Sequence, residues 1–144
     1  MIRQLGAAVL LGLAVAVAGC STDDTPTSSG GNTSRTVKAD PSFANDIQEI
    51  FNRRGCSGSS CHGSAQSAGL DLRTGNAYGE LVGVTATESG LKRVEAGDAA
   101  ASYLVVKVEG TQTTGDQMPL GGQPLDATDL QNIKNWVNQG AKNN

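Results

Sequence analysis

The chain has 144 residues, with eleven Lys and Arg against fourteen Asp and Glu and a net charge of −3 at pH 7. A net acidic chain has no excess of cations with which to neutralise phosphates, so we do not expect nucleic acid as a partner. Glycine accounts for 19 residues and aromatic residues for only 3% of the chain. The side chains alone therefore offer a thin apolar core, even for one small domain.

An apolar run opens the chain. It extends from Leu5 to Gly19, follows Arg3 and ends at Cys20. A basic start before a run shorter than the roughly 20 residues that span a bilayer indicates an export signal. The segment Val17-Ala18-Gly19-Cys20 resembles a bacterial lipobox, which implies cleavage before Cys20 and lipidation of that cysteine. An ordinary secretory signal with an unrelated cysteine is the alternative.

This pattern divides the chain into a lipoprotein signal peptide (1–19), a lipid-anchored Cys20 with a flexible linker (20–38) and a single domain (39–144). The linker is rich in Ser, Thr, Asp and Gly without apolar periodicity, so we expect it to be disordered. Lipidation would place the protein in the bacterial cell envelope. Because Ser21 and not Asp follows the cysteine, we expect the outer membrane facing the periplasm rather than the inner membrane, with surface exposure as an alternative.

Two amphipathic helices are predicted at the two ends of the domain. Asp40 is expected to cap the first helix, Pro41 fits its first turn, and Gly55 ends it. Asp126 is expected to cap the last helix, which ends before Gly140. The apolar faces are Phe43, Ile47, Ile50 and Phe51 in the first helix, and Leu130, Ile133, Trp136 and Val137 in the last. Each face needs a partner against which to pack.

The middle of the domain is less regular. Residues 99–108 are predicted to be a third helix, although their β-branched valines would also suit a strand. Residues 63–88 are rich in Gly, Ser and Thr, so loops and short helical turns are expected there. The predicted fold class is therefore all-α.

Cys56, Cys61 and His62 form a Cys-x4-Cys-His motif, and His62 is the only histidine in the chain. Two thiols followed at once by an imidazole is the arrangement that bonds haem covalently, with the thiols adding to the vinyl groups and the histidine ligating iron. The usual spacing leaves two residues between the cysteines. Here four small or flexible residues intervene, Ser57 to Ser60, which can bulge as a loop. The motif predicts one covalently bound haem c.

Two other interpretations of the motif remain open. With Cys20 lipidated, Cys56 and Cys61 could form a disulfide with each other in an oxidising compartment. A structural zinc site would need four N or S ligands, whereas the mature domain offers three.

A haem iron bound by His62 needs a ligand on its other side, for which Met, Lys, Tyr and water are candidates. Apart from Met1, the chain has one methionine, Met118, in the polar and glycine-bearing segment 115–122 and directly before Pro119. Thioether ligation raises the reduction potential and closes the sixth position of the iron. The alternative is a methionine that fills a gap in the core.

A helix, a Cys-x(n)-Cys-His motif, a later Met-Pro and a terminal helix carrying Trp136 together resemble the class I cytochrome c fold over residues 40–141. Within that group, residues 91–98 are similar to the Arg-Val-x-Pro-Gly-Asp segment of planctomycete-type cytochrome domains, with Ala96 in place of the proline. The resemblance implies that the first and last helices pack together around the haem.

Arg93 lies in this segment, and its guanidinium could bind a haem propionate through two parallel hydrogen bonds. A solvated surface charge is the alternative. Tyr78 and Trp136 are further propionate candidates.

The sequence therefore predicts a lipid-anchored monohaem electron carrier, not an enzyme. Its partners would be a redox protein donor and acceptor, with the membrane reached through the lipid anchor, and the pattern specifies no oligomeric state. The alternatives are a haem enzyme or gas sensor with an open sixth position, and a haem-free surface lipoprotein with a disulfide. Peroxidase chemistry is disfavoured because no second histidine is present for acid–base work.

Overall fold

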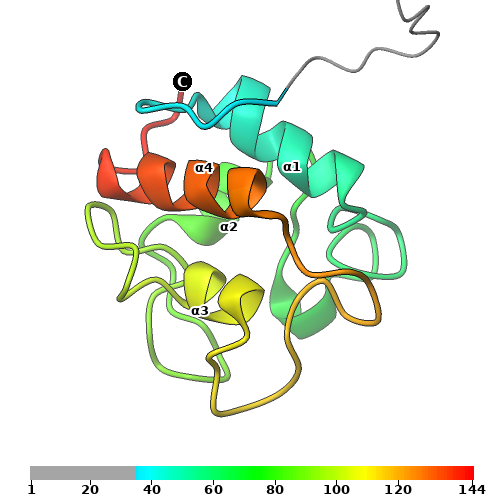
Figure 1. The fold of residues 1–144 in the computed structure, drawn as a ribbon. Helices are drawn as coiled ribbons and strands as arrows, with labels where there is room; N and C mark the ends of the chain where they lie inside the picture. The colour runs from blue at the N-terminus through cyan, green and yellow to red at the C-terminus, as the bar shows by residue number, and fades with distance from the viewer. Residues whose placement is uncertain (1–34) are drawn as a thin grey trace, which may run out of the picture. The chain divides into compact units, whose positions relative to one another are not determined.

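A computed structural model describes residues 35–144, and the predicted signal peptide, Cys20 and most of the linker lie outside the described residues. The described part is all-α: it contains helices and no strand (Figure 1). In chain order the elements are η1 (Phe43–Ile47), α1 (Gln48–Arg53), η2 (Ser67–Gly69), α2 (Ala77–Leu81), α3 (Tyr103–Glu109) and α4 (Ala127–Asn138). No helix among residues 35–144 is long and apolar enough to cross a membrane.

The first predicted helix forms as η1 followed directly by α1, but its cap is not Asp40. Ser42 is the N-cap, and its hydroxyl accepts from the Asn45 N–H, while the Asp46 carboxylate accepts from the Ser42 N–H at 2.8 Å. Asp40 instead forms an ion pair with Lys142 at 3.0 Å. The bonds of Ser42 with Asn45 and Asp46 therefore fix the start two residues later than expected, which leaves Pro41 ahead of the helix rather than in its first turn.

Gly55 ends the first helix as predicted. Arg54 is the C-cap of α1, and Gly55 follows it with φ +75°. A residue in this left-handed conformation after the C-cap is a common way to end a helix, and glycine adopts it without strain.

The prediction for α4 is confirmed at its start. The Asp126 side chain accepts from the Asp129 N–H at 3.0 Å. Ile133, Trp136 and Val137 are buried on one face, and Gly140 follows the helix with φ +95°.

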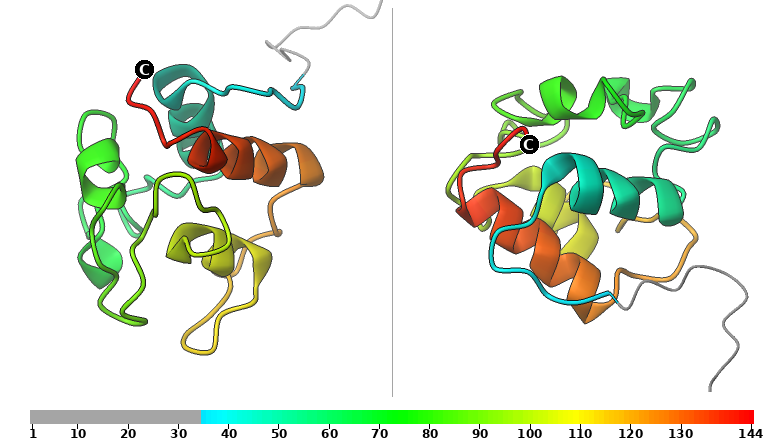
Figure 2. Two further views of the ribbon diagram at one scale, coloured as in Figure 1. Left: turned by 90° about the vertical axis from the view of Figure 1, so that its left-hand side faces the viewer. Right: turned by 90° about the horizontal axis from the view of Figure 1, so that it is seen from above.

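The predicted contact between the first and last helices is also confirmed. The Phe43 and Trp136 rings lie 5.2 Å apart between centroids, and Ile47, Ile50 and Phe51 belong to the same buried cluster as Ile133 and Val137. Figures 1 and 2 show α1 and α4 side by side. The C-terminus closes this pair of helices, since the Asn144 carbonyl accepts from the Ala44 N–H at 2.8 Å.

The third helix exists but begins later than predicted. α3 starts at Tyr103 rather than at Ala99. The Asp98 carboxylate accepts from the Ala101 N–H, and the Ser102 hydroxyl donates to the Asp98 carbonyl at 2.7 Å. These side-chain bonds hold a turn where the alanines alone would favour a helix. Between the cysteine motif and Glu88, the short elements η2 and α2 joined by loops match the prediction.

Residues 35–38, expected to belong to the flexible linker, lie along α4. Arg35 pairs with Asp126 at 2.7 Å and with Asp129 at 2.9 Å, and the Lys38 N–H donates to Asn132 at 2.8 Å. The Asp129 side chain is almost fully buried and also pairs with Arg53 at 2.8 Å. A buried carboxylate needs such cations, so the segment that supplies Arg35 is held in place.

Candidate functional site

A cavity of about 520 Å³ opens among the end of α1, the cysteine motif, α3 and the segment before α4. Its size is typical of a site for a small molecule or cofactor. Five of the seven domain residues considered as binding residues from the sequence line it: Cys56, Cys61, His62, Arg93 and Met118. Much of the remaining wall is apolar, including Phe51, Leu72, Leu81, Leu104, Val108 and Ile133.

The four residues between the cysteines form a hydrogen-bonded loop. The Gly58 carbonyl accepts from both the Cys61 and the Gly63 N–H, each at 3.0 Å, and the His62 N–H donates to the Cys56 carbonyl at 3.0 Å. This loop accommodates the longer spacing between the cysteines, and both cysteines and the histidine still line one cavity.

Gly63 is a site residue that the sequence analysis missed. It is buried directly behind the motif, and a Cβ at this position would lie 2.4 Å from the Ser57 carbonyl oxygen and 2.6 Å from that of Gly58. Such contacts are far too short, so the loop closes this tightly only over a glycine. Its place directly after the histidine was the available signal.

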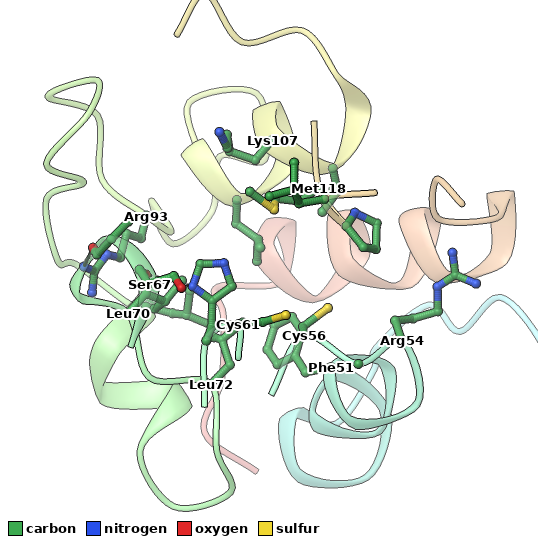
Figure 3. A pocket seen from close by; sticks show the side chains of 18 of the residues that line it. Phe51, Arg54, Cys56, Cys61, Ser67, Leu70, Leu72, Arg93, Lys107 and Met118 are labelled. Carbon is green, nitrogen blue, oxygen red and sulfur yellow. Dashed lines mark hydrogen bonds between the residues drawn. The ribbon is translucent and has the colours of Figure 1, made fainter. Parts of the chain in front are cut away.

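The two thiols of the motif are free. Cys56 is half-buried and Cys61 is exposed, and Figure 3 shows both beside the cavity. Burial raises the pKa of the Cys56 thiol above its usual range. The thiol is therefore protonated at neutral pH and is not the thiolate that a cysteine nucleophile in catalysis requires.

The His62 ring is oriented by one backbone contact. Its Nδ1 lies 2.9 Å from the Ser67 carbonyl oxygen. Because a carbonyl can only accept, we assign the proton of the neutral ring to Nδ1, which leaves the Nε2 lone pair available to a metal. A ligating histidine is commonly held in this way by its other nitrogen.

Met118 lies across the cavity from the two cysteines (Figure 3). It is half-buried, and its N–H donates to the Lys107 carbonyl at 2.9 Å. The neighbouring Gln117 side chain donates to the Val108 carbonyl at 3.1 Å. The segment that carries the thioether is thus attached to the end of α3.

Arg93 is buried, with 8% of its surface exposed, so the alternative of a solvated surface charge is wrong. Nη1 donates to the Glu80 carbonyl and carboxylate, and Nη2 donates to the carbonyls of Ala68 and Gly69. Four of the five N–H groups are thus used to join α2 to η2. Only the Nε–H is left for a propionate.

Tyr78 and Trp136, the other propionate candidates, do not line the cavity. The Tyr78 hydroxyl donates to the Ala141 carbonyl and the Trp136 Nε1–H donates to the Lys142 carbonyl, each at 2.9 Å. Their donors therefore hold the C-terminal segment, and neither is placed to bind a group in the cavity.

Arg54 and Lys107 line the cavity without having been assigned to it. The Arg54 guanidinium donates to the carbonyls of Gln123 and Pro124, while the Lys107 ammonium lies 3.6 Å from the Glu88 carboxylate. The sequence offers no signal for either residue, because each contacts residues far from it in the chain.

The donor set suits a haem bonded through its periphery. Two thiols lie next to one imidazole whose Nε2 is available, a thioether lies across the cavity, and apolar side chains line the space between them. Among residues 35–144, no three His, Cys, Asp or Glu side chains gather in a way that would hold a metal ion by themselves.

No protein-family model matches the chain, and neither a curated protein nor a solved structure is found to be similar to it. The functional assignment therefore rests on the residues of the site.

Proposed function

We propose that the protein is a monohaem c-type cytochrome that carries single electrons between redox proteins of the bacterial cell envelope, anchored there through a lipid on Cys20. One observation carries the proposal: Cys56, Cys61, His62 and Met118, chosen from the sequence alone, line a single cavity with apolar walls.

In this proposal each residue has a distinct role. Cys56 and Cys61 supply the two thiols for thioether bonds, and His62 supplies Nε2 while Ser67 holds its Nδ1–H. Met118 supplies a soft thioether from the opposite side, which favours the reduced state and raises the reduction potential. A haem, when bound, supplies the one-electron chemistry. The apolar residues around it exclude water from the site.

The fold supports the same proposal. The first and last helices pack through Phe43 and Trp136, as the class I cytochrome c arrangement would require. A haem would also supply apolar surface to a domain that has few aromatic residues. The cytochrome fold is thus part of the proposal, and the all-α class is the observation that supports it.

The two alternative functions require different roles of the residues that line the cavity. A haem enzyme or gas sensor needs an open position on the iron, whereas Met118 lines the same cavity as His62. A haem-free lipoprotein with a Cys56–Cys61 disulfide gives no role to Met118 or to the available nitrogen of His62.

Absorption spectra of the oxidised and reduced protein, produced with a c-type haem maturation system, test the proposal. We expect covalent haem with the red charge-transfer band that marks methionine bound to ferric iron. The matched variant is Met118→Leu, which keeps the apolar volume and removes the sulfur. It should lose the band and bind carbon monoxide when reduced. A high-spin wild type that binds carbon monoxide would favour the enzyme or sensor, and a colourless protein would favour the disulfide lipoprotein.

A further inference from the structure

Arg54 is positioned between the two sides of the candidate site. It is the C-cap of α1 and lies two residues before Cys56. Its Nη2 donates to the Gln123 carbonyl at 2.6 Å and to the Pro124 carbonyl at 2.7 Å. Both carbonyls belong to the segment that leads from Met118 to α4. One guanidinium therefore joins the cysteine side of the cavity to the methionine side (Figure 3).

The segment around Met118 has two legs, and they are held differently. The leg before the methionine is bonded to α3 through the Met118 N–H and the Gln117 side chain. In the leg after it, residues 119–125, the Gly122 N–H donates only within the segment, to Pro119. Within residues 35–144, the two bonds from Arg54 are the hydrogen bonds that join this second leg to the rest of the domain.

Side-chain packing adds little to the hold on this second leg. Leu120 is exposed, and Leu125, at its far end, is the residue of the leg that packs against the core. The Arg54 bonds are charge-assisted, so they are stronger than neutral ones. Among residues 35–144 the buried Arg54 Nε has no hydrogen-bond partner, so the two Nη2 bonds are the hydrogen bonds that hold the guanidinium.

We propose that Arg54 is a positioning residue: by holding residues 123–124 against the end of α1, it keeps the Met118 sulfur facing the cavity. The role in ligation rests on the proposed function, whereas the hold on the segment does not. Loss of the guanidinium frees the second leg, and Met118 then remains attached only through the leg bonded to α3.

The test compares Arg54→Gln and Arg54→Lys with Arg53→Gln in the haem-loaded protein. Arg53 is a matched control because it is adjacent, carries the same charge and pairs with Glu49 and Asp129 outside the cavity. Arg54→Gln should weaken the methionine charge-transfer band at least several-fold and make the ferrous protein bind carbon monoxide. Arg54→Lys should retain part of the band, since an ammonium can still donate to one carbonyl. Arg53→Gln should keep the whole band.

A second readout separates this inference from the proposed function. Amide hydrogen exchange at Gly122, measured on the protein as purified, should be at least tenfold faster in Arg54→Gln than in the wild type and unchanged in Arg53→Gln, whereas the Met118 amide stays bonded to Lys107 in all three proteins. If the glutamine variant does not fold, Arg54→Lys takes its place, and its exchange at Gly122 should also be faster than in the wild type, by a smaller factor.

A wild type without haem would refute the proposed function, while the exchange rates would still decide whether Arg54 holds the segment. Unchanged exchange at Gly122 in the Arg54 variants would overturn the inference. So would a full charge-transfer band and no carbon monoxide binding in folded Arg54→Gln.

Discussion

Replacing Gly63 with alanine tests how the motif tolerates four residues between its cysteines. An alanine Cβ would lie 2.4 Å from the Ser57 carbonyl oxygen, 2.6 Å from that of Gly58 and 2.9 Å from the Gly58 carbonyl carbon, whereas ordinary contact begins at 3.4 Å. All three atoms are backbone, so no flexible side chain can move aside. The loop would have to shift by the difference between 3.4 and 2.4 Å, which is 1.0 Å.

That shift has an energetic cost that can be estimated. Forcing an extra methyl group into a packed site costs about 1–3 kcal/mol. The displaced Gly58 carbonyl accepts two hydrogen bonds, from Cys61 and Gly63, and loss of one costs about 1 kcal/mol more. We therefore expect Gly63→Ala to lower the free energy of unfolding by about 2–4 kcal/mol, out of a total of about 5–15 kcal/mol for a typical domain.

Urea denaturation followed by circular dichroism measures this change, with Gly79→Ala as the control. Gly79 lies within α2, and a Cβ there would meet nothing within 4 Å. The control should be stabilised by about 0.5–1 kcal/mol, since alanine is the better helix former. If Gly63→Ala unfolded at the same urea concentration as the wild type, the close packing of the motif loop would be refuted.

Three further predictions concern other parts of the domain. Asp126→Ala should destabilise the protein by about 1 kcal/mol in the same denaturation assay, whereas Asp126→Asn, which keeps a capping oxygen, should have a much smaller effect; equal losses would argue against the cap. The Arg73 guanidinium holds the pKa of Asp71 well below its ordinary value of 3.8, so the stabilisation is complete above that pH and is lost as the pH falls further. Thermal melts should therefore show a shallower acid decline for Asp71→Asn than for the wild type, and parallel declines would contradict this. His62→Ala should lower the yield of folded, haem-loaded protein through loss of its Nε2, and a full yield measured by haem absorbance would show that His62 does not hold the cofactor.

The terminal helices could be predicted because their signals are local. Apolar residues three and four positions apart mark the buried face of each helix, and Phe43 and Trp136 lie where the two faces meet. Asp126 directly precedes the last helix, where its side chain can accept from the first free N–H groups. The candidate site could be predicted for a similar reason. Covalent haem chemistry imposes a short motif, and a chain with one methionine outside Met1 offers few choices for the second ligand.

The remaining features depend on contacts between distant residues. Asp40 carries a capping side chain, but Lys142 binds it from the other end of the chain. The sequence leaves Arg93 as either a propionate donor or a surface charge, because nothing in its own segment shows that Glu80, Ala68 and Gly69 surround it. Arg54 and Arg53 are neighbours in sequence, yet one contacts the segment after Met118 and the other contacts α4. Such roles depend on the fold and could not be predicted from the sequence.

The central claim is that Cys56 and Cys61 bind a haem covalently, and mass spectrometry of the denatured protein tests it most directly. Protein produced with a c-type haem maturation system should carry the mass of one haem that survives unfolding, and the Cys56→Ser, Cys61→Ser double variant should lack it. A wild type without the added mass, two mass units lighter than its reduced form, would instead contain a Cys56–Cys61 disulfide and would contradict the account.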